Sequence, residues 1–132
     1  MNLQVEVSVG EFLDKLTILE IKCERIADPA KLENVRKERD LLKRLWSESH
    51  LKDTDISVKL GELKIINEAL WVIEDRIREK ESEKAFDAEF IELARAVYVT
   101  NDKRAAIKRE LNIALGSELI EEKSYADYTQ KK

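Results

Sequence analysis

Residues 56–83, ISVKLGELKIINEALWVIEDRIREKESE, form the stretch that decides the fold. The stretch lacks proline, and its apolar residues recur at the three- and four-residue spacing of an α-helix. At about 1.5 Å per residue, such a helix is about 40 Å long. One apolar stripe holds Ile56, Leu63, Ile66, Leu70, Ile73 and Ile77, and a second, roughly opposite, holds Val58, Ile65, Ala69 and Val72. A helix with two apolar faces has something packed on both of them.

Capping signals predict two helices before this stretch. Ser8 and Glu11 have the spacing of a capping box, which predicts that a helix begins there. We expect this helix to run to about Ala27. Asp28-Pro29 then supplies an N-cap and a first-turn proline for a second helix over about 30–48.

Similar signals follow the long helix. Phe86, Asp87 and Ile91 resemble a hydrophobic staple around an aspartate cap, which predicts the start of a fourth helix. Thr100-Asn101-Asp102 favours a break and a fifth helix that ends at Gly116; the alternative is one continuous helix. Short links between helices predict antiparallel neighbours.

The composition indicates the same fold class. The chain has 132 residues with only three Gly and one Pro, whereas folds rich in strands need many turns and hence many such residues. The length suits one domain with one hydrophobic core. We therefore predict an all-α single domain over 1–132, an up-and-down bundle of four to five helices. A short extended N-terminal arm (1–7) precedes it, and a polar C-terminal tail (117–132) of at most partial order follows it.

The N-terminal arm has its own pattern. Residues 3–9, LQVEVSV, alternate apolar and polar with the period of a half-buried strand. A lone strand has no partner in a helical bundle. The arm therefore lies on the bundle, or it pairs with the tail or with a second copy of the chain.

Cysteine content, hydropathy and charge limit the location and the partners. Cys23 is the only cysteine, so no disulfide forms within the chain, and the N-terminus lacks the plan of a secretory signal. No apolar run approaches the roughly 20 residues of a membrane-spanning helix. We predict a cytoplasmic protein that does not bind membranes. The net charge of −4 opposes general affinity for nucleic acid, because contacts of cations with phosphates supply most of such binding, so we predict no nucleic-acid partner.

Two of the predicted helices are apolar on two sides. On the helix that begins near Ser8, one arc holds Val9, Phe12, Leu16, Leu19, Cys23 and Ile26, and Ile18 and Ile21 lie opposite. One such helix can be covered by its own chain, but two are harder to cover in a small bundle. We therefore predict a homodimer with the helix over 56–83 at its interface. The alternative is that loops or the N-terminal arm cover the second stripes.

Several charged and polar residues occupy helix positions that should face inward. Glu20 lies inside the apolar arc of its helix, and Arg104 lies among apolar residues of the last helix with Lys108 one turn on. A strip that borders the core stripe of the long helix holds Asn67, Trp71, Glu74, Arg78 and Glu81. Burial of an unpaired charge is costly, so we predict that Glu20 and Glu74 form an internal network with Arg104 and Lys108.

The leading hypothesis is a helical binding or interaction module with a polar pocket between helices. In this pocket Arg104 and Lys108 hold a small anionic ligand such as a phosphate or a carboxylate. Trp71 and Tyr98 supply flat apolar walls. The predicted ligand-binding set is completed by Glu20, Asn67, Glu74 and Arg78.

Two alternatives stay open. One is a metal-assisted hydrolase or transferase that acts on a phosphorylated small molecule, with Glu74 and Asp75 as weak candidate metal ligands or bases. The other is a purely structural dimeric bundle with a buried ion-pair network. The sequence contains no phosphate-binding glycine loop, H-E-x-x-H motif or paired C-x-x-C, so it indicates no particular cofactor.

Five segments carry a resemblance to a known family: 14–22 (DKLTILEIK), 67–78 (NEALWVIEDRIR), 90–98 (FIELARAVY), 101–108 (NDKRAAIK) and 121–125 (EEKSY). Through them nearly the whole chain resembles a small bacterial family known only as a domain of unknown function. The resemblance implies that polar residues within these segments matter for more than surface solubility. It also implies that Ser124 and Tyr125 of the tail dock on the bundle or close over a site.

The enzyme alternative has a weaker resemblance of its own. All-α nucleotide pyrophosphohydrolases hold Mg²⁺ with acidic pairs on adjacent helices. In that family a Glu-Glu-x-x-Glu motif on one helix is paired with a Glu-x-x-Asp motif on another, and this sequence lacks that pair of motifs.

Overall fold

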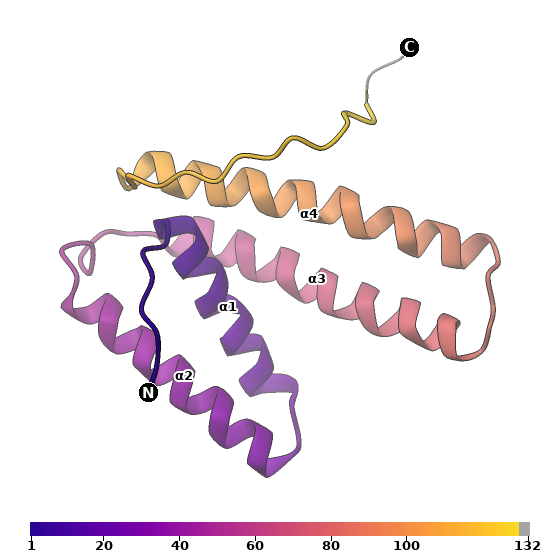
Figure 1. Ribbon diagram of the computed structural model, residues 1–132, viewed down its shortest axis with the longest axis horizontal. Coiled ribbons are helices and arrows are strands. Elements are labelled where there is room, and N and C mark those ends of the chain that lie inside the picture. Colours follow the sequence, from indigo (N-terminus) through magenta and orange to yellow (C-terminus); the bar gives the residue numbers. More distant parts are fainter. Residues whose placement is uncertain (130–132) are drawn as a thin grey trace.

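The computed structural model describes residues 1–129, and this range is built from four α-helices (Figure 1). They are α1 (Val9–Arg25), α2 (Pro29–Glu48), α3 (Ser57–Ser82) and α4 (Ala88–Ala114). The same range contains no strand. The prediction of an all-α bundle with a short N-terminal arm is confirmed. None of the four helices within residues 1–129 combines the length and the apolar character that crossing a membrane requires.

Three helices begin at the caps that the sequence predicts. Ser8 Oγ accepts a hydrogen bond from the backbone N–H of Glu11 at 3.0 Å. Asp28 caps α2 and Asp87 caps α4 in the same way. Each of these bonds satisfies a backbone N–H that has no partner within its own helix. Local side-chain chemistry therefore fixes where these helices start.

The last helix, α4, is continuous through residues 100–102, so the predicted break and fifth helix are wrong. Thr, Asn and Asp each cost less than about 0.7 kcal/mol in a helix interior. Packing of α4 against α3 along the hairpin outweighs that preference. The helix ends at Ala114, and Gly116 follows with a left-handed φ of 67°, which glycine adopts without strain.

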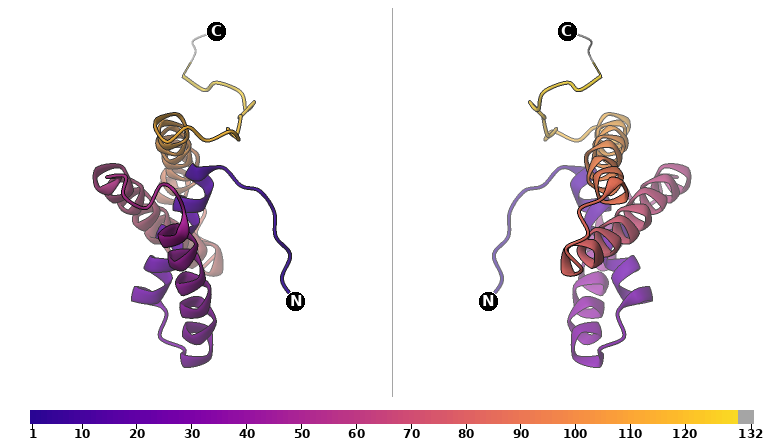
Figure 2. Two further views of the ribbon diagram at one scale, coloured as in Figure 1. Left: turned by 90° about the vertical axis from the view of Figure 1, so that its left-hand side faces the viewer. Right: turned by 90° about the vertical axis from the view of Figure 1, so that its right-hand side faces the viewer.

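The central helix of the bundle is α1. It packs against α2, α3 and α4, while α3 and α4 form an antiparallel hairpin (Figure 1 and Figure 2). The main core, shared by α1, α3 and α4, consists of Leu13, Leu63, Ile107 and Leu111. A second cluster, between α1 and α2, consists of Leu16, Leu19 and Leu42. Polar side chains on α1 can therefore meet partners from every other helix.

Both apolar faces of α1 are covered by the chain itself. Ile21, which the sequence places opposite the core stripe, is 1% exposed. Cys23, which the sequence places within that stripe, is only partly buried. Because three helices surround α1, a second copy of the chain is not needed to cover it.

The second stripe of α3 stays open to solvent. Val58 is 72% exposed, Ile65 is 68% exposed and Val72 is 54% exposed. Ala69, between them on the same face, is exposed as well. The predicted homodimer through this face is not tested by a single chain, and it stays a prediction.

The two ends of the chain behave differently. The arm, residues 1–7, is exposed and stands away from the helices, without a strand partner among residues 1–129 (Figure 2). The tail, described as far as residue 129, runs back beside α4 (Figure 1). Its Glu121 carboxylate accepts hydrogen bonds from Ser8 Oγ and from Asn112 Nδ2. Residues 130–132, the end of the predicted tail, lie outside the described residues.

Candidate functional site

A buried polar centre lies between α1, α3 and α4. Asp14 is 2% exposed, Thr17 is 3% exposed and Asn67 is 5% exposed. The Asn67 side-chain amide donates to Asp14 Oδ1 and to Thr17 Oγ1, each at 2.9 Å. The Thr17 hydroxyl donates to the backbone carbonyl of Asp14 at 2.7 Å. One oxygen of the Asp14 carboxylate is thus held by an amide from α3.

The other oxygen of Asp14 faces two cations of α4. Asp14 Oδ2 lies 3.7 Å from Arg104 Nε and 3.7 Å from Lys108 Nζ. Lys108 also donates to the Glu11 carboxylate, one turn before Asp14. A buried carboxylate is costly unless it is paired and hydrogen-bonded, and Asp14 has both kinds of partner.

This arrangement corrects the predicted ion-pair network. Glu20 pairs with Lys43 of α2 at 3.1 Å, and Glu74 pairs with Arg78 of its own helix at 3.3 Å. The carboxylate that contacts Arg104 and Lys108 is Asp14, which sequence reasoning missed. The reason is that α1 packs against three helices, and Glu20 lies on the side that faces α2 instead of α4.

A signal for Asp14 was present in the sequence. Asp14 and Thr17 lie on the same side of α1 as Ile18 and Ile21, at helical spacing. Ile18 and Ile21 indicate that this side of α1 is buried, so the Asp14 carboxylate on the same side needs a partner.

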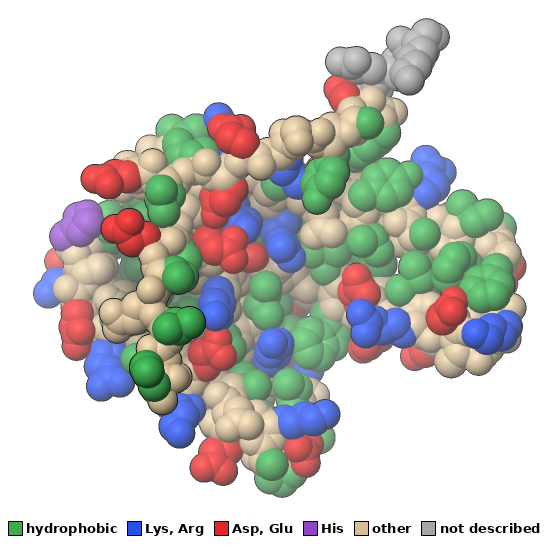
Figure 3. Space-filling model, viewed as in Figure 1, with side chains coloured by type: hydrophobic (Ala, Val, Ile, Leu, Met, Phe, Trp, Pro, Cys, Tyr) green, Lys and Arg blue, Asp and Glu red, His purple; other side chains and the backbone are tan. Residues whose placement is uncertain are grey.

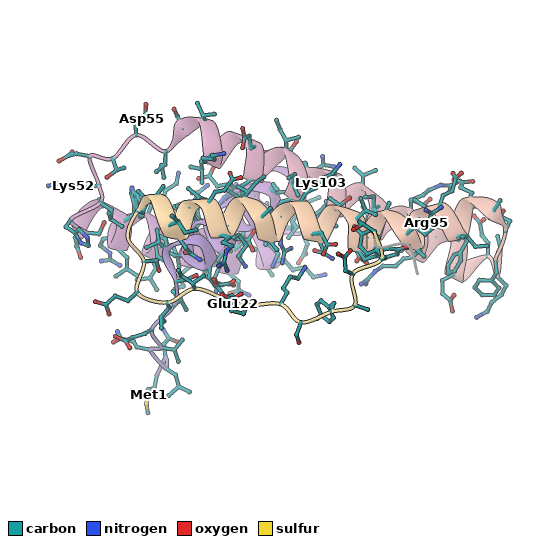
Figure 4. The ribbon with its side chains drawn as sticks, turned by 90° about the horizontal axis from the view of Figure 1, so that it is seen from above. Met1, Lys52, Asp55, Arg95, Lys103 and Glu122 are labelled. Atoms are coloured by element: carbon teal, nitrogen blue, oxygen red, sulfur yellow. The ribbon has the colours of Figure 1, made fainter. Side chains whose placement is uncertain are left out.

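A basic cavity of about 290 Å³ lies next to Asp14, between α4 and the tail. It is lined by Asn101, Arg104, Ala105, Lys108 and Arg109 of α4, and by Glu121, Lys123 and Tyr125 of the tail. Figure 3 shows Lys and Arg side chains gathered beside the tail on this face. In Figure 4 the tail, with Glu122 labelled, runs alongside α4, on which Lys103 is labelled. Four of the eight lining residues are cations, so the cavity is suited to an anion.

The tail is fixed to the cavity by Glu121. Burial opposes ionisation of this carboxyl, but hydrogen bonds from Ser8 and Asn112 outweigh it, so the pKa of Glu121 is lowered. Asn112 Oδ1 accepts in turn from the backbone N–H of Gly10 at 2.6 Å. A Cβ at Gly10 would lie 2.5 Å from the carbonyl oxygen of Lys108, so the glycine allows α1 and α4 to approach closely.

Exposed acids pair with two of the cations. Arg109 Nη1 lies 2.9 Å from Glu122, and Lys123 Nζ donates to Asp102 at 3.0 Å. Hydrogen bonds from Lys123 and then from Tyr128 hold the pKa of Asp102 below its ordinary value. The four partners of these two ion pairs are all well exposed, and exposed pairs contribute about 0–1 kcal/mol. An incoming anion can therefore take over these cations at small cost.

A second hollow, here called the Trp71 groove, adjoins the cavity. It has a volume of about 300 Å³ and is lined by Ile18, Asn67, Leu70, Trp71, Glu74, Asp75, Arg78 and Arg104. Five predicted site residues therefore line one groove: Asn67, Trp71, Glu74, Arg78 and Arg104. Arg104 lines the basic cavity as well.

The remaining predicted site residues lie elsewhere. Lys108 lines the basic cavity but not the Trp71 groove, and Glu20 lies at the α1–α2 contact. Tyr98 packs edge-on against Tyr128 of the tail, with ring centroids 5.0 Å apart, in a third hollow that shares Asn101, Lys123 and Tyr125 with the basic cavity. Glu74 and Asp75, the weak metal candidates, belong to the Trp71 groove, and residues 1–129 hold no cluster of three His, Cys, Asp or Glu side chains suited to a metal ion. Sequence reasoning missed Asn101, Arg109 and Lys123, because only the returning tail brings these polar residues to one cavity.

No curated protein and no solved structure matches the chain. One family model matches residues 3–130, almost the entire sequence, under the description "Family of unknown function (DUF6165)". The family that the sequence resembles and the family whose model matches are both of unknown function. On this match, the chain belongs to the DUF6165 family of unknown function.

Proposed function

We propose that this chain is a binding module for a small anion, with a phosphate or carboxylate group held in the basic cavity. The observation that carries the proposal is the convergence of Arg104, Lys108, Arg109 and Lys123 on one hollow. Its volume of about 290 Å³ is close to the lower end of the range for small-molecule sites, roughly 300–1,000 Å³.

Arg104 is the residue best suited to grip the anion. Its side chain makes no hydrogen bond within residues 1–129, and its contact with Asp14, at 3.7 Å from Nε, is longer than a hydrogen bond. The guanidinium presents five N–H donors in a planar fork that matches a phosphate or carboxylate with two parallel bonds. The nearby Asp14 carboxylate orients Arg104 while it leaves these donors available.

The tail closes the site. Lys123 and Tyr125 come from the tail, and both line the cavity that α4 forms on its other side. Lys123 Nζ lies 5.5 Å from the centre of the Tyr125 ring, a cation–π distance. The resemblance implied that Tyr125 docks on the bundle or closes over a site; Tyr125 lines the cavity and is 84% exposed.

Thermal unfolding tests the proposal. A ligand that binds only the folded chain stabilises it by about 2.7 kcal/mol at a hundred times its Kd. Inorganic phosphate should therefore raise Tm more than chloride at equal ionic strength. Arg109→Ala should reduce this rise, because Arg109 is an exposed cavity residue whose loss leaves the core intact.

Lys103 supplies the matched control. It is an exposed cation on α4 that does not line the cavity, so Lys103→Ala changes the net charge by the same amount. The phosphate effect should survive in this variant. Equal Tm values in phosphate and chloride would contradict the proposal, as would equal losses in the two variants.

A further inference from the structure

The basic cavity and the Trp71 groove meet at one side chain, and this junction indicates what kind of anion fits. Arg104 lines both hollows. We propose that the ligand is a phosphorylated ring compound that spans them, with its phosphate in the basic cavity and its ring in the Trp71 groove. This inference rests on the proposed function and deepens it.

The Asp14 carboxylate connects the linings of the two hollows. Its Oδ1 accepts from Asn67, a lining residue of the groove. Its Oδ2 lies 3.7 Å from Lys108 Nζ, a lining residue of the cavity. One lining residue of each hollow therefore contacts the same carboxylate, which puts the two hollows next to each other.

The groove is suited to a neutral ring. Ile18, Leu70 and Trp71 provide apolar lining, and the indole of Trp71 offers a flat surface. Glu74 and Asp75 provide carboxylate oxygens, which accept hydrogen bonds from hydroxyl or amino groups. An apolar face with such groups on its edge is the shared chemistry of a sugar ring and of a nucleoside.

The charges fix the orientation. The groove holds two carboxylates, Glu74 and Asp75, which balance its two cations, Arg78 and Arg104. A phosphate there would meet like charge, which disfavours it. The cavity holds four cations and one carboxylate, Glu121, which is itself bound to Ser8 and Asn112. The phosphate therefore belongs in the cavity and the ring in the groove.

Tryptophan fluorescence tests the inference directly. The chain has two tryptophans, and Trp46 of α2 stacks on Phe12 of α1, with ring centroids 6.0 Å apart, against the main core. Trp46→Phe leaves Trp71 as the only tryptophan and keeps an aromatic ring in contact with Phe12. Inorganic phosphate, glucose 6-phosphate, adenosine monophosphate, glucose and adenosine would each be titrated into this variant.

At least one of the two phosphate esters should change Trp71 fluorescence and bind about tenfold more tightly than inorganic phosphate, because stacking on an aromatic side chain contributes roughly 1–3 kcal/mol. Glucose and adenosine, which lack the phosphate, should bind far more weakly than their esters. The ester that binds more tightly identifies the ring as a sugar or a nucleoside.

Calorimetry on Trp71→Leu gives a second readout. The substitution keeps an apolar side chain and removes the flat ring, so the affinity for the better ester should fall about tenfold, to that of inorganic phosphate. The affinity for inorganic phosphate should be unchanged. Circular dichroism checks that this variant is folded, and the Trp46→Phe titration stands alone if it is not.

The outcomes distinguish failure of the spanning ligand from failure of the proposed anion-binding function. Equal binding of phosphate and both esters, with constant Trp71 fluorescence, would overturn the spanning ligand and leave the anion site in place. Absence of binding by phosphate and by both esters would overturn the anion site and the spanning ligand together.

Discussion

The side-chain amide of Asn67 donates to the carboxylate of Asp14 at 2.9 Å, although 53 positions separate the two residues in the sequence. Both side chains are buried, and Asp14 also lies 3.7 Å from Arg104 and from Lys108. This contact joins α1 to α3 at the point where α4 contributes its cations. The buried centre and the two hollows beside it therefore depend on a single carboxylate.

Removal of that carboxylate should destabilise the fold. Asp14→Ala removes one acceptor of the buried Asn67 amide and the carboxylate that lies between Arg104 and Lys108. Breaking a buried pair typically costs about 3–5 kcal/mol. Urea denaturation measures the loss. Lys15→Ala, which removes an exposed ion pair with Glu38 one position along, should cost less than about 1 kcal/mol. Similar losses in the two variants would show that Asp14 has no special structural role.

The same substitution at two glycines should have opposite effects. Gly10→Ala puts a Cβ 2.5 Å from the backbone carbonyl of Lys108, so α1 and α4 must separate, at a cost of about 1–3 kcal/mol. Gly61→Ala, on α3, meets open space and should stabilise the helix by roughly 0.5–1 kcal/mol. Urea midpoints of the two variants check both signs. A stabilised Gly10→Ala protein would contradict the close approach of the helices.

Loss of an acid near the basic cavity should strengthen anion binding. Glu122 pairs with Arg109 at 2.9 Å, and an exposed pair of this kind contributes about 0.2–1 kcal/mol. Glu122→Gln frees Arg109, so the affinity for inorganic phosphate measured by calorimetry should rise about two- to fivefold. Glu118→Gln, elsewhere on the tail, makes the same change in net charge outside the cavity. If Glu118→Gln raises the affinity equally, the effect is one of overall charge.

The turn between α3 and α4 should give the fold a dependence on acid pH. Lys80 donates to Asp87 at 2.8 Å and lies 3.1 Å from Glu89. Hydrogen bonds from Lys80 hold the pKa of both carboxyls below their ordinary values. In the unfolded chain the pKa of Asp is about 3.9 and that of Glu about 4.3. Because both folded pKa values are lower, the two carboxylates stabilise the fold fully above these unfolded values. This stabilisation is lost as the pH falls through the folded pKa values.

The free energy of unfolding should therefore fall as the pH drops below about 4. Lys80→Met should make that fall shallower, because the pKa values of Asp87 and Glu89 then lie closer to those of the unfolded chain. Urea denaturation across this acid range measures the slope, with Lys103→Met as the exposed control. Identical slopes in wild type and Lys80→Met would rule out this source of acid sensitivity.

The open face of α3 carries the prediction of a homodimer. Sedimentation should give twice the chain mass of 15.4 kDa. Ile65→Lys puts a charge on the exposed stripe and should yield a monomer, because an unpaired charge is costly in an apolar interface. Ile91→Lys, at a position on α4 that is 58% exposed, should remain dimeric. A wild-type chain that sediments as a monomer would show that this stripe has no second copy against it.

Much of the architecture was predictable from contacts between neighbours in the sequence. Ser8, Asp28 and Asp87 cap their helices through backbone groups three residues away, so the sequence alone determined these starts. The scarcity of glycine and proline determined the all-α class. For the site, helical periodicity identified residues of the Trp71 groove, because Asn67, Trp71 and Glu74 share one side of a single helix.

Only the tertiary structure decided which charges meet. Periodicity gives the side of a helix on which Glu20 or Asp14 lies, but not the helix that packs there, and α1 packs against three other helices. Packing also kept α4 continuous through residues 100–102 against their local preference. The basic cavity forms because the tail returns along α4 and is anchored at Glu121. Contacts within one helical turn can be predicted from neighbouring residues in the sequence, whereas contacts between distant segments depend on how the whole chain packs.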